Sequence, residues 1–246
     1  LLRRIFAMTK LTILSSTEQE HFDSPPKFNA DDRALNFSLT NTELKLVEEL
    51  RTATNKAGFV LQLGYFKANG KFFVAEQFRH LDIQYVTNLL GILPNDVDWL
   101  LYQQRTPINH QKRILSLQGW QPFDIAQQRK VTAHITWLIQ RQLSAKPVFL
   151  SAIDFCWQNK IELPSCNTLT TIITNAYNHF EQGLVDIIAK KLTQYHRTKL
   201  DQLMGADVKN KKRLQRSPIT LIKQVNQSLQ PSDIQENIEA FKVFKG

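Results

Sequence analysis

The sequence from residue 105 to residue 123 reads Arg105-Thr-Pro-Ile-Asn-His-Gln-Lys-Arg-Ile-Leu-Ser-Leu-Gln-Gly-Trp-Gln-Pro-Phe123, and an amphipathic segment follows it to Arg141. Thr106-Pro107 favours a helix start with proline at the first helical position, and Gly119 favours the end of that helix. Asp124 suits the cap of the next helix. Two basic helices joined by an aromatic turn are typical of a helix-turn-helix pair. We therefore expect this stretch to contact DNA.

Apolar residues recur at helical spacing along most of the chain. The clearest stripe has its members at i, i+4, i+7, i+8 and i+12, namely Val131, Ile135, Leu138, Ile139 and Leu143. The chain has 246 residues, enough to bury a substantial core, and only 8 Gly and 9 Pro to interrupt helices. The sequence predicts an all-α, multi-helical fold with tandem helix-turn-helix-like units followed by long packed helices.

Two glycines lie inside a predicted helix that starts near Lys56 and stops at Asn69-Gly70. Gly58 and Gly64 each cost about 1 kcal/mol relative to alanine in a helix interior. We expect close approach of another element to explain both. Farther along, Asp82 is expected to cap a helix that runs to Leu90.

The positive charge is concentrated in one segment. Residues 105–216 hold 17 Lys and Arg against 7 Asp and Glu, whereas residues 1–104 hold 11 against 12. The whole excess of +9 therefore comes from the second half of the chain. Such an asymmetry favours a phosphate-facing surface. The alternative is a generally basic protein whose positive side chains are simply solvated.

Candidate DNA contacts follow from residue type, since Arg and Lys bind phosphate or guanine, and Asn and Gln can read adenine. We predict contacts from Asn55, Lys56, Lys67, Lys71, Arg105, Asn109, His110, Gln111, Lys112, Arg113, Gln121, Arg129, Lys130, Lys209, Lys211, Lys212, Arg213 and Arg216. Base reading is expected from residues 109–121 and phosphate contact from most of the others. Residues 209–216 could be a flexible arm along a groove or a solvated linker. Trp120 and Phe123 are expected to fasten the turn to the core.

The sequence shows no pattern of a catalytic or metal site. It has no Gly-rich phosphate loop, HExxH or GxSxG, and its six histidines lie far apart. Glu48 and Glu49 are helix neighbours that point about 100° apart, so they cannot act as a pair. Cys156 and Cys166 form no CxxC pair, which favours two reduced thiols over a disulfide. We expect no enzyme activity, cofactor or membrane span in this chain.

Four segments resemble the N-terminal region of the replicative transposases of the Tn-three family. Residues 55–63 resemble the family's N-R-L-G-F-A-L-Q-L, and residues 70–72 its G-R-F. Residues 110–123 are similar to R-x-E-I-x-x-x-L-G-F-R-P-F. Residues 163–169 resemble the family's L-P-x-x-x-T-L, and residues 200–203 resemble its L-D-x-L. The chain departs from the family pattern at Arg113, Gln118, Trp120 and Gln121.

The resemblance implies a tandem helical region that recognises terminal inverted repeats during DNA transposition in bacteria. A catalytic Asp-Asp-Glu domain, with its divalent metal, would lie beyond residue 246. The expected partners are double-stranded DNA and either the rest of a transposase or a second copy, in a nucleoid-associated, cytoplasmic setting. The alternatives are a freestanding regulator of transposition and a helical scaffold with no nucleic-acid role.

The expected division of the chain follows from these segments. Residues 1–8 would be an upstream or disordered extension, 9–104 a first DNA-binding unit and 105–204 a second unit with long helices. Residues 205–216 would form a basic linker, and 217–246 the start of a truncated helical region.

Overall fold

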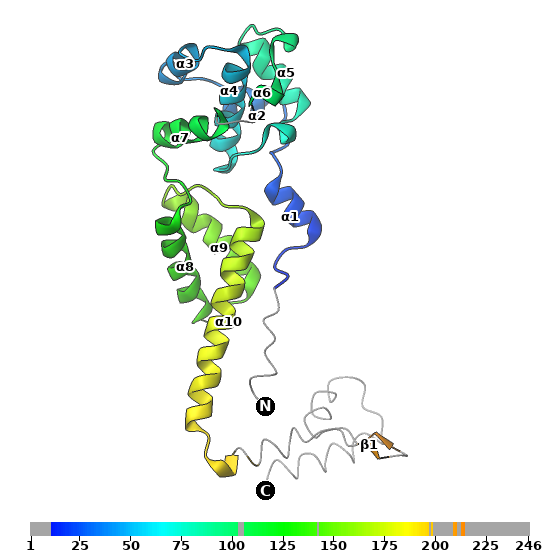
Figure 1. Ribbon diagram of the computed structural model, residues 1–246, viewed down its shortest axis with the longest axis vertical. Coiled ribbons are helices and arrows are strands. Elements are labelled where there is room, and N and C mark those ends of the chain that lie inside the picture. The colour runs from blue at the N-terminus through cyan, green and yellow to red at the C-terminus, as the bar shows by residue number, and fades with distance from the viewer. Residues whose placement is uncertain are drawn as a thin grey trace. The chain divides into compact units, whose positions relative to one another are not determined.

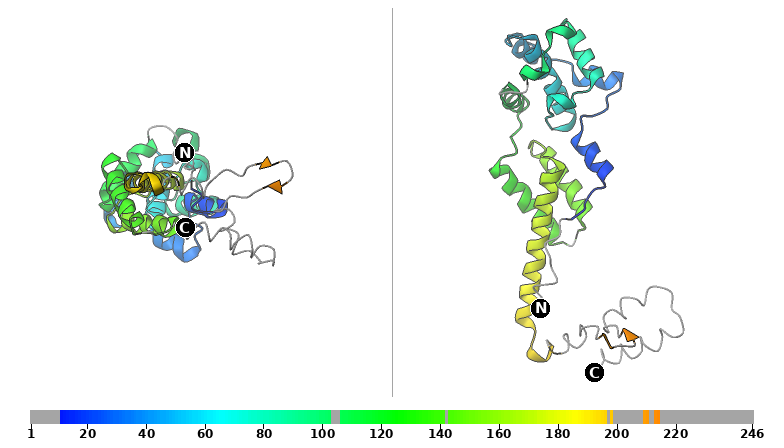
Figure 2. Two further views of the ribbon diagram at one scale, coloured as in Figure 1. Left: turned by 90° about the horizontal axis from the view of Figure 1, so that it is seen from below. Right: turned by 45° about the vertical axis from the view of Figure 1, so that its right-hand side comes forward.

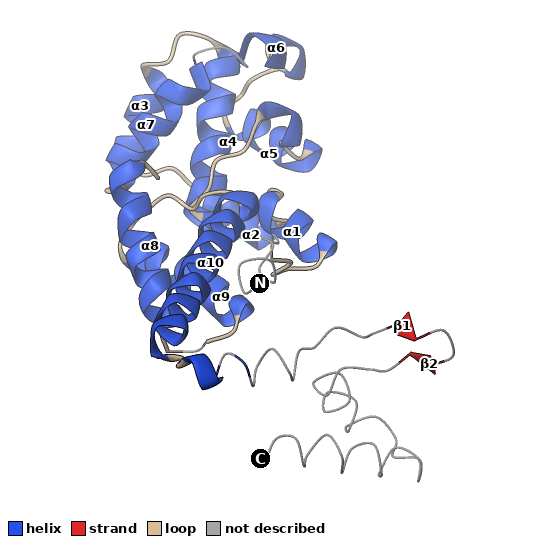
Figure 3. Cartoon of the chain, turned by 60° about the horizontal axis from the view of Figure 1, so that its bottom comes forward, coloured by secondary structure: helices blue, strands red, loops and turns tan. Residues whose placement is uncertain are grey.

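The computed structural model describes residues 11–102, 106–141, 143–196 and 198, with the backbone of residues 209–210 and 213–214. The described part is built from helices, as predicted (Figures 1 and 3). The helices are α1 (Ser16–Asp23), α2 (Ala30–Asn36), α3 (Asn41–Glu48), α4 (Ala53–Asn69), η2 (Ala75–Gln77), α5 (His80–Leu89), η3 (Pro94–Asp96), α6 (Trp99–Tyr102), α7 (Thr106–Gln118), α8 (Ile125–Ile139), α9 (Ala145–Gln158) and α10 (Cys166–Lys191).

The helix α4 is the centre of a first hydrophobic cluster. Every residue from Ala57 to Phe66 is buried, so this helix has no exposed side along its middle. The helices α2, α3, α5, α6 and α7 pack on it (Figure 1). α7 adds Ile114 and Leu115 to this cluster. A helix that is buried all round can exist only because its neighbours cover every face.

Close approach explains the two glycines of α4, as the sequence predicts. A Cβ atom on Gly58 would lie 2.2 Å from the Tyr102 ring, and one on Gly64 would lie 2.2 Å from the Phe37 ring. The helix ends at Asn69, and Gly70 takes the left-handed conformation with φ of 62°. Its N-terminal cap is Thr52, whose hydroxyl accepts from the amide of Asn55 at 3.1 Å.

A second hydrophobic cluster forms where α8, α9 and the first part of α10 lie side by side (Figures 1 and 2). Four members of the predicted stripe, Val131, Ile135, Leu138 and Ile139, are buried on α8, whereas the fifth, Leu143, lies beyond the end of this helix and is half-buried. α9 and α10 contribute apolar side chains such as Phe149 and Ile173. Ile13 and Leu14, which precede α1, also belong to this cluster.

The packing of α7 and α8 differs from the predicted helix-turn-helix pair. The buried side chains of α7 lie in the first cluster with α4, whereas those of α8 lie in the second cluster with α9. The turn between them contacts both clusters, through Trp120 and Phe123. A sequence-based boundary at residue 104 would separate α7 from α4, on which it packs.

The chain divides into two compact units, residues 1–182 and 183–246, with the boundary inside α10. Both hydrophobic clusters lie in the first unit. In the second unit, the backbones of β1 (Lys209–Asn210) and β2 (Arg213–Leu214) pair antiparallel. The predicted basic linker thus contains a short ladder. The proposed extension at residues 1–8 and the region 217–246 lie outside the described residues.

Asp82 does not cap α5, contrary to the prediction. The helix begins at His80, so Asp82 lies in its first turn and is fully buried. Its carboxylate accepts from Nε of Arg33 at 2.6 Å and from the Tyr65 hydroxyl at 2.9 Å. A buried carboxylate needs a positively charged partner, and Arg33 supplies one. This pairing explains the position of Asp82 better than helix capping does.

Candidate nucleic-acid interface

The outward side of α7 carries polar and basic side chains at helical spacing. Asn109, Lys112 and Arg113 are exposed, at i, i+3 and i+4, while Ile114 and Leu115 face the core. Lys112 forms no ion pair with any described residue. This side of the helix therefore offers one amide and at least one unpaired cation to a partner.

Arg113 forms an ion pair with Glu49, the residue that follows α3. Nη2 of Arg113 lies 2.8 Å from Oε2 of Glu49, and the two side chains are 43% and 58% exposed. A pair this exposed contributes about 0–1 kcal/mol. The guanidinium can therefore exchange the carboxylate for another anion at little cost.

Three predicted site residues are buried or already bonded to other residues, so they are not available to DNA. His110 is buried, and its Nδ1 lies 3.0 Å from the Tyr102 hydroxyl. Burial, with a smaller contribution from the charge of Arg113, lowers the pKa of His110 to about 4. Lys67 donates to Glu43 at 3.0 Å. These contacts hold the fold, so we leave His110 and Lys67 out of the interface.

Lys71 is the third of these residues. Its side chain is 8% exposed and donates to the carboxylate of Asp23 at 2.6 Å and to the carbonyl of Phe22 at 3.0 Å. Burial lowers the pKa of Lys71, and the Asp23 carboxylate acts against that shift. The same carboxylate accepts from the amide of Cys166 at the start of α10. Lys71 therefore joins the end of α1 to the end of α4.

The turn after α7 is fastened to both clusters, as predicted for its aromatic residues. Trp120 packs edge-on against Phe66 and Trp157, with ring centroids 5.0 Å away in each case. Phe123 packs against the second cluster. Gln121 exchanges backbone hydrogen bonds with Lys160 and Glu162, and its side chain accepts from Gln127. The turn is thus held in place, but the Gln121 side chain is already engaged.

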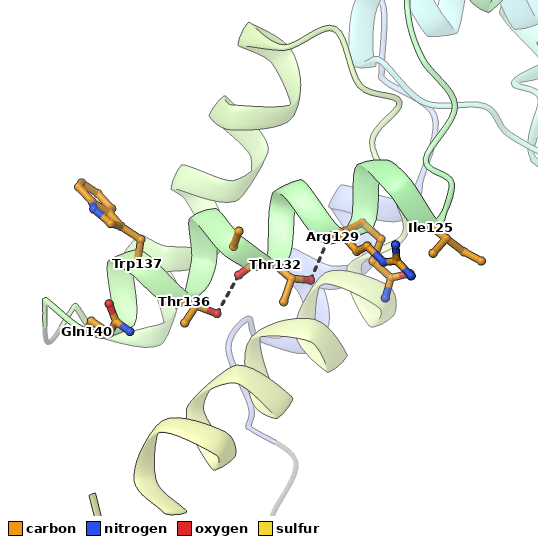
Figure 4. A pocket seen from close by; sticks show the side chains of 8 residues that line it. Ile125, Arg129, Thr132, Thr136, Trp137 and Gln140 are labelled. Carbon is orange, nitrogen blue, oxygen red and sulfur yellow. Dashed lines mark hydrogen bonds between the residues drawn. The ribbon is translucent and has the colours of Figure 1, made fainter. Parts of the chain in front are cut away.

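The helix α8 exposes a second basic and polar surface. Arg129 and Lys130 are exposed and form no ion pair within the described part of the chain. Arg129 lines a shallow depression together with Gln128, Thr132 and Thr136 of the same helix (Figure 4). The sequence prediction included the two cations but missed these polar neighbours. Their spacing was the available signal, since Gln128, Thr132 and Thr136 recur at i, i+4 and i+8.

The remaining predicted residues are spread more widely. Asn55 and Lys56 are half-buried in the first turns of α4. Gln111 is half-buried on α7. Arg105, Lys211, Lys212 and Arg216 lie outside the described residues, and for Lys209 and Arg213 only the backbone is described.

The described residues contain neither a metal site nor a membrane span. There, no three His, Cys, Asp or Glu side chains gather where a metal ion could bind. No helix in that part is both long and apolar enough to cross a membrane. Cys156 and Cys166 are both buried and form no disulfide with each other, in agreement with the predicted reduced thiols.

Comparison with known proteins adds a family and several relatives. A protein-family model described as "Domain of unknown function (DUF4158)" matches residues 13–176. The chain is 25% identical over 169 residues to the "Transposase for transposon Tn1546" of Enterococcus faecium, covering 68% of this chain and 17% of that protein. It is 23% identical over 201 residues to the "Transposase for transposon Tn21" of Escherichia coli, covering 80% and 20%.

A third relative matches almost the whole chain. The "Transposase for transposon Tn501" of Pseudomonas aeruginosa is 23% identical over 244 residues, covering 97% of this chain and 24% of that protein. The chain thus spans about a sixth to a quarter of the length of the curated relatives that it matches. These similarities support an N-terminal transposase region, in agreement with the resemblance seen in the sequence.

Proposed function

The chain belongs to the family described as Domain of unknown function (DUF4158), and we propose that it binds the terminal inverted repeats of a transposon. It would do so as the N-terminal part of a DNA transposase, with strand cutting and joining carried out by another part of that enzyme. The relatives are transposases by name, which supports DNA as the partner.

The observation that carries the proposal is the set of exposed cations without a carboxylate partner on α7 and α8. Lys112, Arg129 and Lys130 are exposed and unpaired among the described side chains, and Arg113 has only a weak surface pair. Elsewhere in that part, Arg33, Lys67 and Lys71 are tied to partly or fully buried acids, whereas Lys45 and Arg51 are also exposed without an ion pair. Cations free of carboxylates can neutralise phosphates and release counterions, which is the main source of affinity for DNA.

Asn109 and Lys112 have complementary roles in this proposal. The Asn109 amide can form two hydrogen bonds with an adenine edge. Lys112, one turn further along the same exposed side of α7, would contact a phosphate and fix the register of the helix. Arg113 would exchange Glu49 for a phosphate as the complex forms.

A variant series in a salt titration tests this proposal. We expect Lys112→Ala to weaken binding to the inverted repeat and to lower the slope of log affinity against log salt by about 0.9, since one phosphate contact is lost. Replacing Lys112 and Arg113 together should lower it further. Lys27→Ala is the matched control, because Lys27 is also exposed but lies outside α7 and α8. An equal effect of Lys27→Ala and Lys112→Ala would refute the placement of the interface.

A further inference from the structure

We infer that the outward face of α8 is a second DNA-reading surface, which lies in a major groove and reads base edges through Gln128, Arg129, Thr132, Thr136 and Gln140. This inference rests on the proposed function, since it names the residues that give that function its sequence preference. None of these positions except Arg129 was a candidate from the sequence.

The geometry suits a groove. The depression on α8 is lined by residues of this helix alone, at the spacing of one face, namely Ile125, Gln128, Arg129, Thr132, Ala133, Thr136, Trp137 and Gln140. In Figure 4, Ile125 and Arg129 lie near one end of this face, and Trp137 and Gln140 lie near the other. From residue 128 to residue 140 the helix rises by ~18 Å, which matches about five base pairs. The major groove is wide enough to admit a helix.

The side chains on this face have the chemistry of base readers. Glutamine amides can pair with adenine, and arginine can pair with guanine. The Thr132 hydroxyl donates to the carbonyl of Gln128 at 2.8 Å, and the Thr136 hydroxyl donates to the carbonyl of Thr132 at 2.9 Å (Figure 4). These bonds use the hydroxyl protons and leave the methyl groups for contact with thymine methyls.

Charge favours DNA over an acidic or neutral protein surface as the occupant. Residues 125–141 contain no Asp or Glu, and the carboxylate that caps the helix, Asp124, accepts from the amide of Gln127. Lys130 flanks the face as an exposed cation. Arg141 flanks it at the other end, where its guanidinium stacks on the Trp137 ring at 3.6 Å. Lys130 and Arg141 are eleven residues apart, so both border the polar centre on the same side of the helix, where they would contact one phosphate strand.

The opposite side of α8 holds the helix rigid. Val131 and Ile135 are fully buried against the second cluster, and α8 packs closely on α9. The reading face can therefore keep its side chains in register without ordering a loop on binding. α7, which packs on α4, would read its own part of the repeat, so the two clusters would each present one helix.

Selection from a pool of randomised 30-base-pair duplexes tests the inference. The wild-type chain should enrich a motif, and Arg129→Ala should lose the preference at one or two adjacent base pairs and bind the selected duplex about 5- to 150-fold more weakly. Gln128→Glu should shift a preference from adenine toward cytosine, because a carboxylate accepts from the cytosine amino group. Lys130→Ala is the control, since a phosphate contact should weaken all sequences equally.

The outcomes separate this inference from the proposed function. If the wild type enriches a motif that Arg129→Ala and Gln128→Glu also enrich unchanged, α8 does not read bases, although the chain still binds specific DNA. If wild type binds every duplex alike, the reading face is refuted together with the sequence preference. If it binds no duplex, the proposed function itself fails. Thermal unfolding of each variant, all at exposed positions, confirms that the fold is intact.

Discussion

Gly58 shows how strongly a single residue can be constrained by its neighbours. A Cβ atom there would lie 2.2 Å from Cε2 of Tyr102, well inside contact distance, and Tyr102 is itself fully buried. We therefore expect Gly58→Ala to lower the free energy of unfolding by about 1–3 kcal/mol, as overpacking of a core does. Urea denaturation measures this change.

Gly183 provides the matched control for that variant. It also lies in a helix, but a Cβ atom there would meet nothing within 4 Å. Gly183→Ala should stabilise its helix by up to about 1 kcal/mol through helix propensity alone. Equal effects of the two substitutions would show that contact with Tyr102 is not the constraint on Gly58.

His110 should make stability depend on pH. Burial lowers its pKa from 6.5 to about 4, so between these values the unfolded chain binds the proton more readily than the folded chain. Stability from this residue is therefore intact above pH 6.5 and is lost as the pH falls toward 4. We expect His110 to cost the fold about 2 kcal/mol at pH 5 relative to pH 7.5.

Urea denaturation of wild type and His110→Gln at both pH values isolates this effect. Glutamine keeps a polar group beside the Tyr102 hydroxyl but does not titrate. The wild type should lose more stability than the variant between pH 7.5 and pH 5. An identical loss in the two proteins would mean that His110 is accessible to protons in the folded chain.

Residue type alone identified the candidate interface only in part. Lys112, Arg129 and Lys130 are exposed as predicted, but Lys71 and His110 are of equally suitable types and are buried. Lys71 is held inside by Asp23, and His110 by Tyr102. No local sequence pattern shows that these partners lie close by. A cation's partner is a property of the tertiary structure, so it could not be derived from spacing.

Helices were easier to predict than their packing. The end of α4 at Asn69 and the buried stripe of α8 follow from local signals, a glycine stop and an apolar period. Although α7 and α8 are adjacent in sequence, they do not pack on each other as a helix pair. Each presents its apolar residues to a different cluster, and that choice depends on surfaces contributed by distant segments.

The ion pair of Lys71 and Asp23 links α1, α4 and α10. Removing either charge should lower the free energy of unfolding, but by unequal amounts. Asp23→Ala leaves the Lys71 ammonium buried without its partner, and it also removes the acceptor for the Cys166 amide. We expect a loss of about 3–5 kcal/mol in the free energy of unfolding. Lys71→Ala should cost less, because the Asp23 side chain is 39% exposed and can be solvated.

The double variant completes the test of this tie. Asp23→Ala with Lys71→Met should recover part of the stability lost in Asp23→Ala, because the buried charge is gone. Chemical denaturation of the three variants provides the comparison. A larger loss for Lys71→Ala than for Asp23→Ala would contradict the account of this contact.

For the molecule as a whole, the all-α class was predictable because helical periodicity runs through most of the sequence. The division of the chain was not, since the two compact units meet inside α10 rather than at a loop. A continuous helix gives no local sign of a boundary, and the positions of contacts decide it. The charge asymmetry, in contrast, is visible in the sequence and agrees with the unpaired cations of α7 and α8.

The most direct test of the central claim is the equilibrium binding of the purified chain to the inverted repeat that flanks its gene, compared with a shuffled duplex of the same composition. We expect the repeat to bind at least about a thousandfold more tightly at physiological salt, with affinity for both duplexes falling as salt rises. Equal affinity for the two duplexes, or affinity that does not change with salt, would contradict the assignment of this chain as a DNA-recognition region.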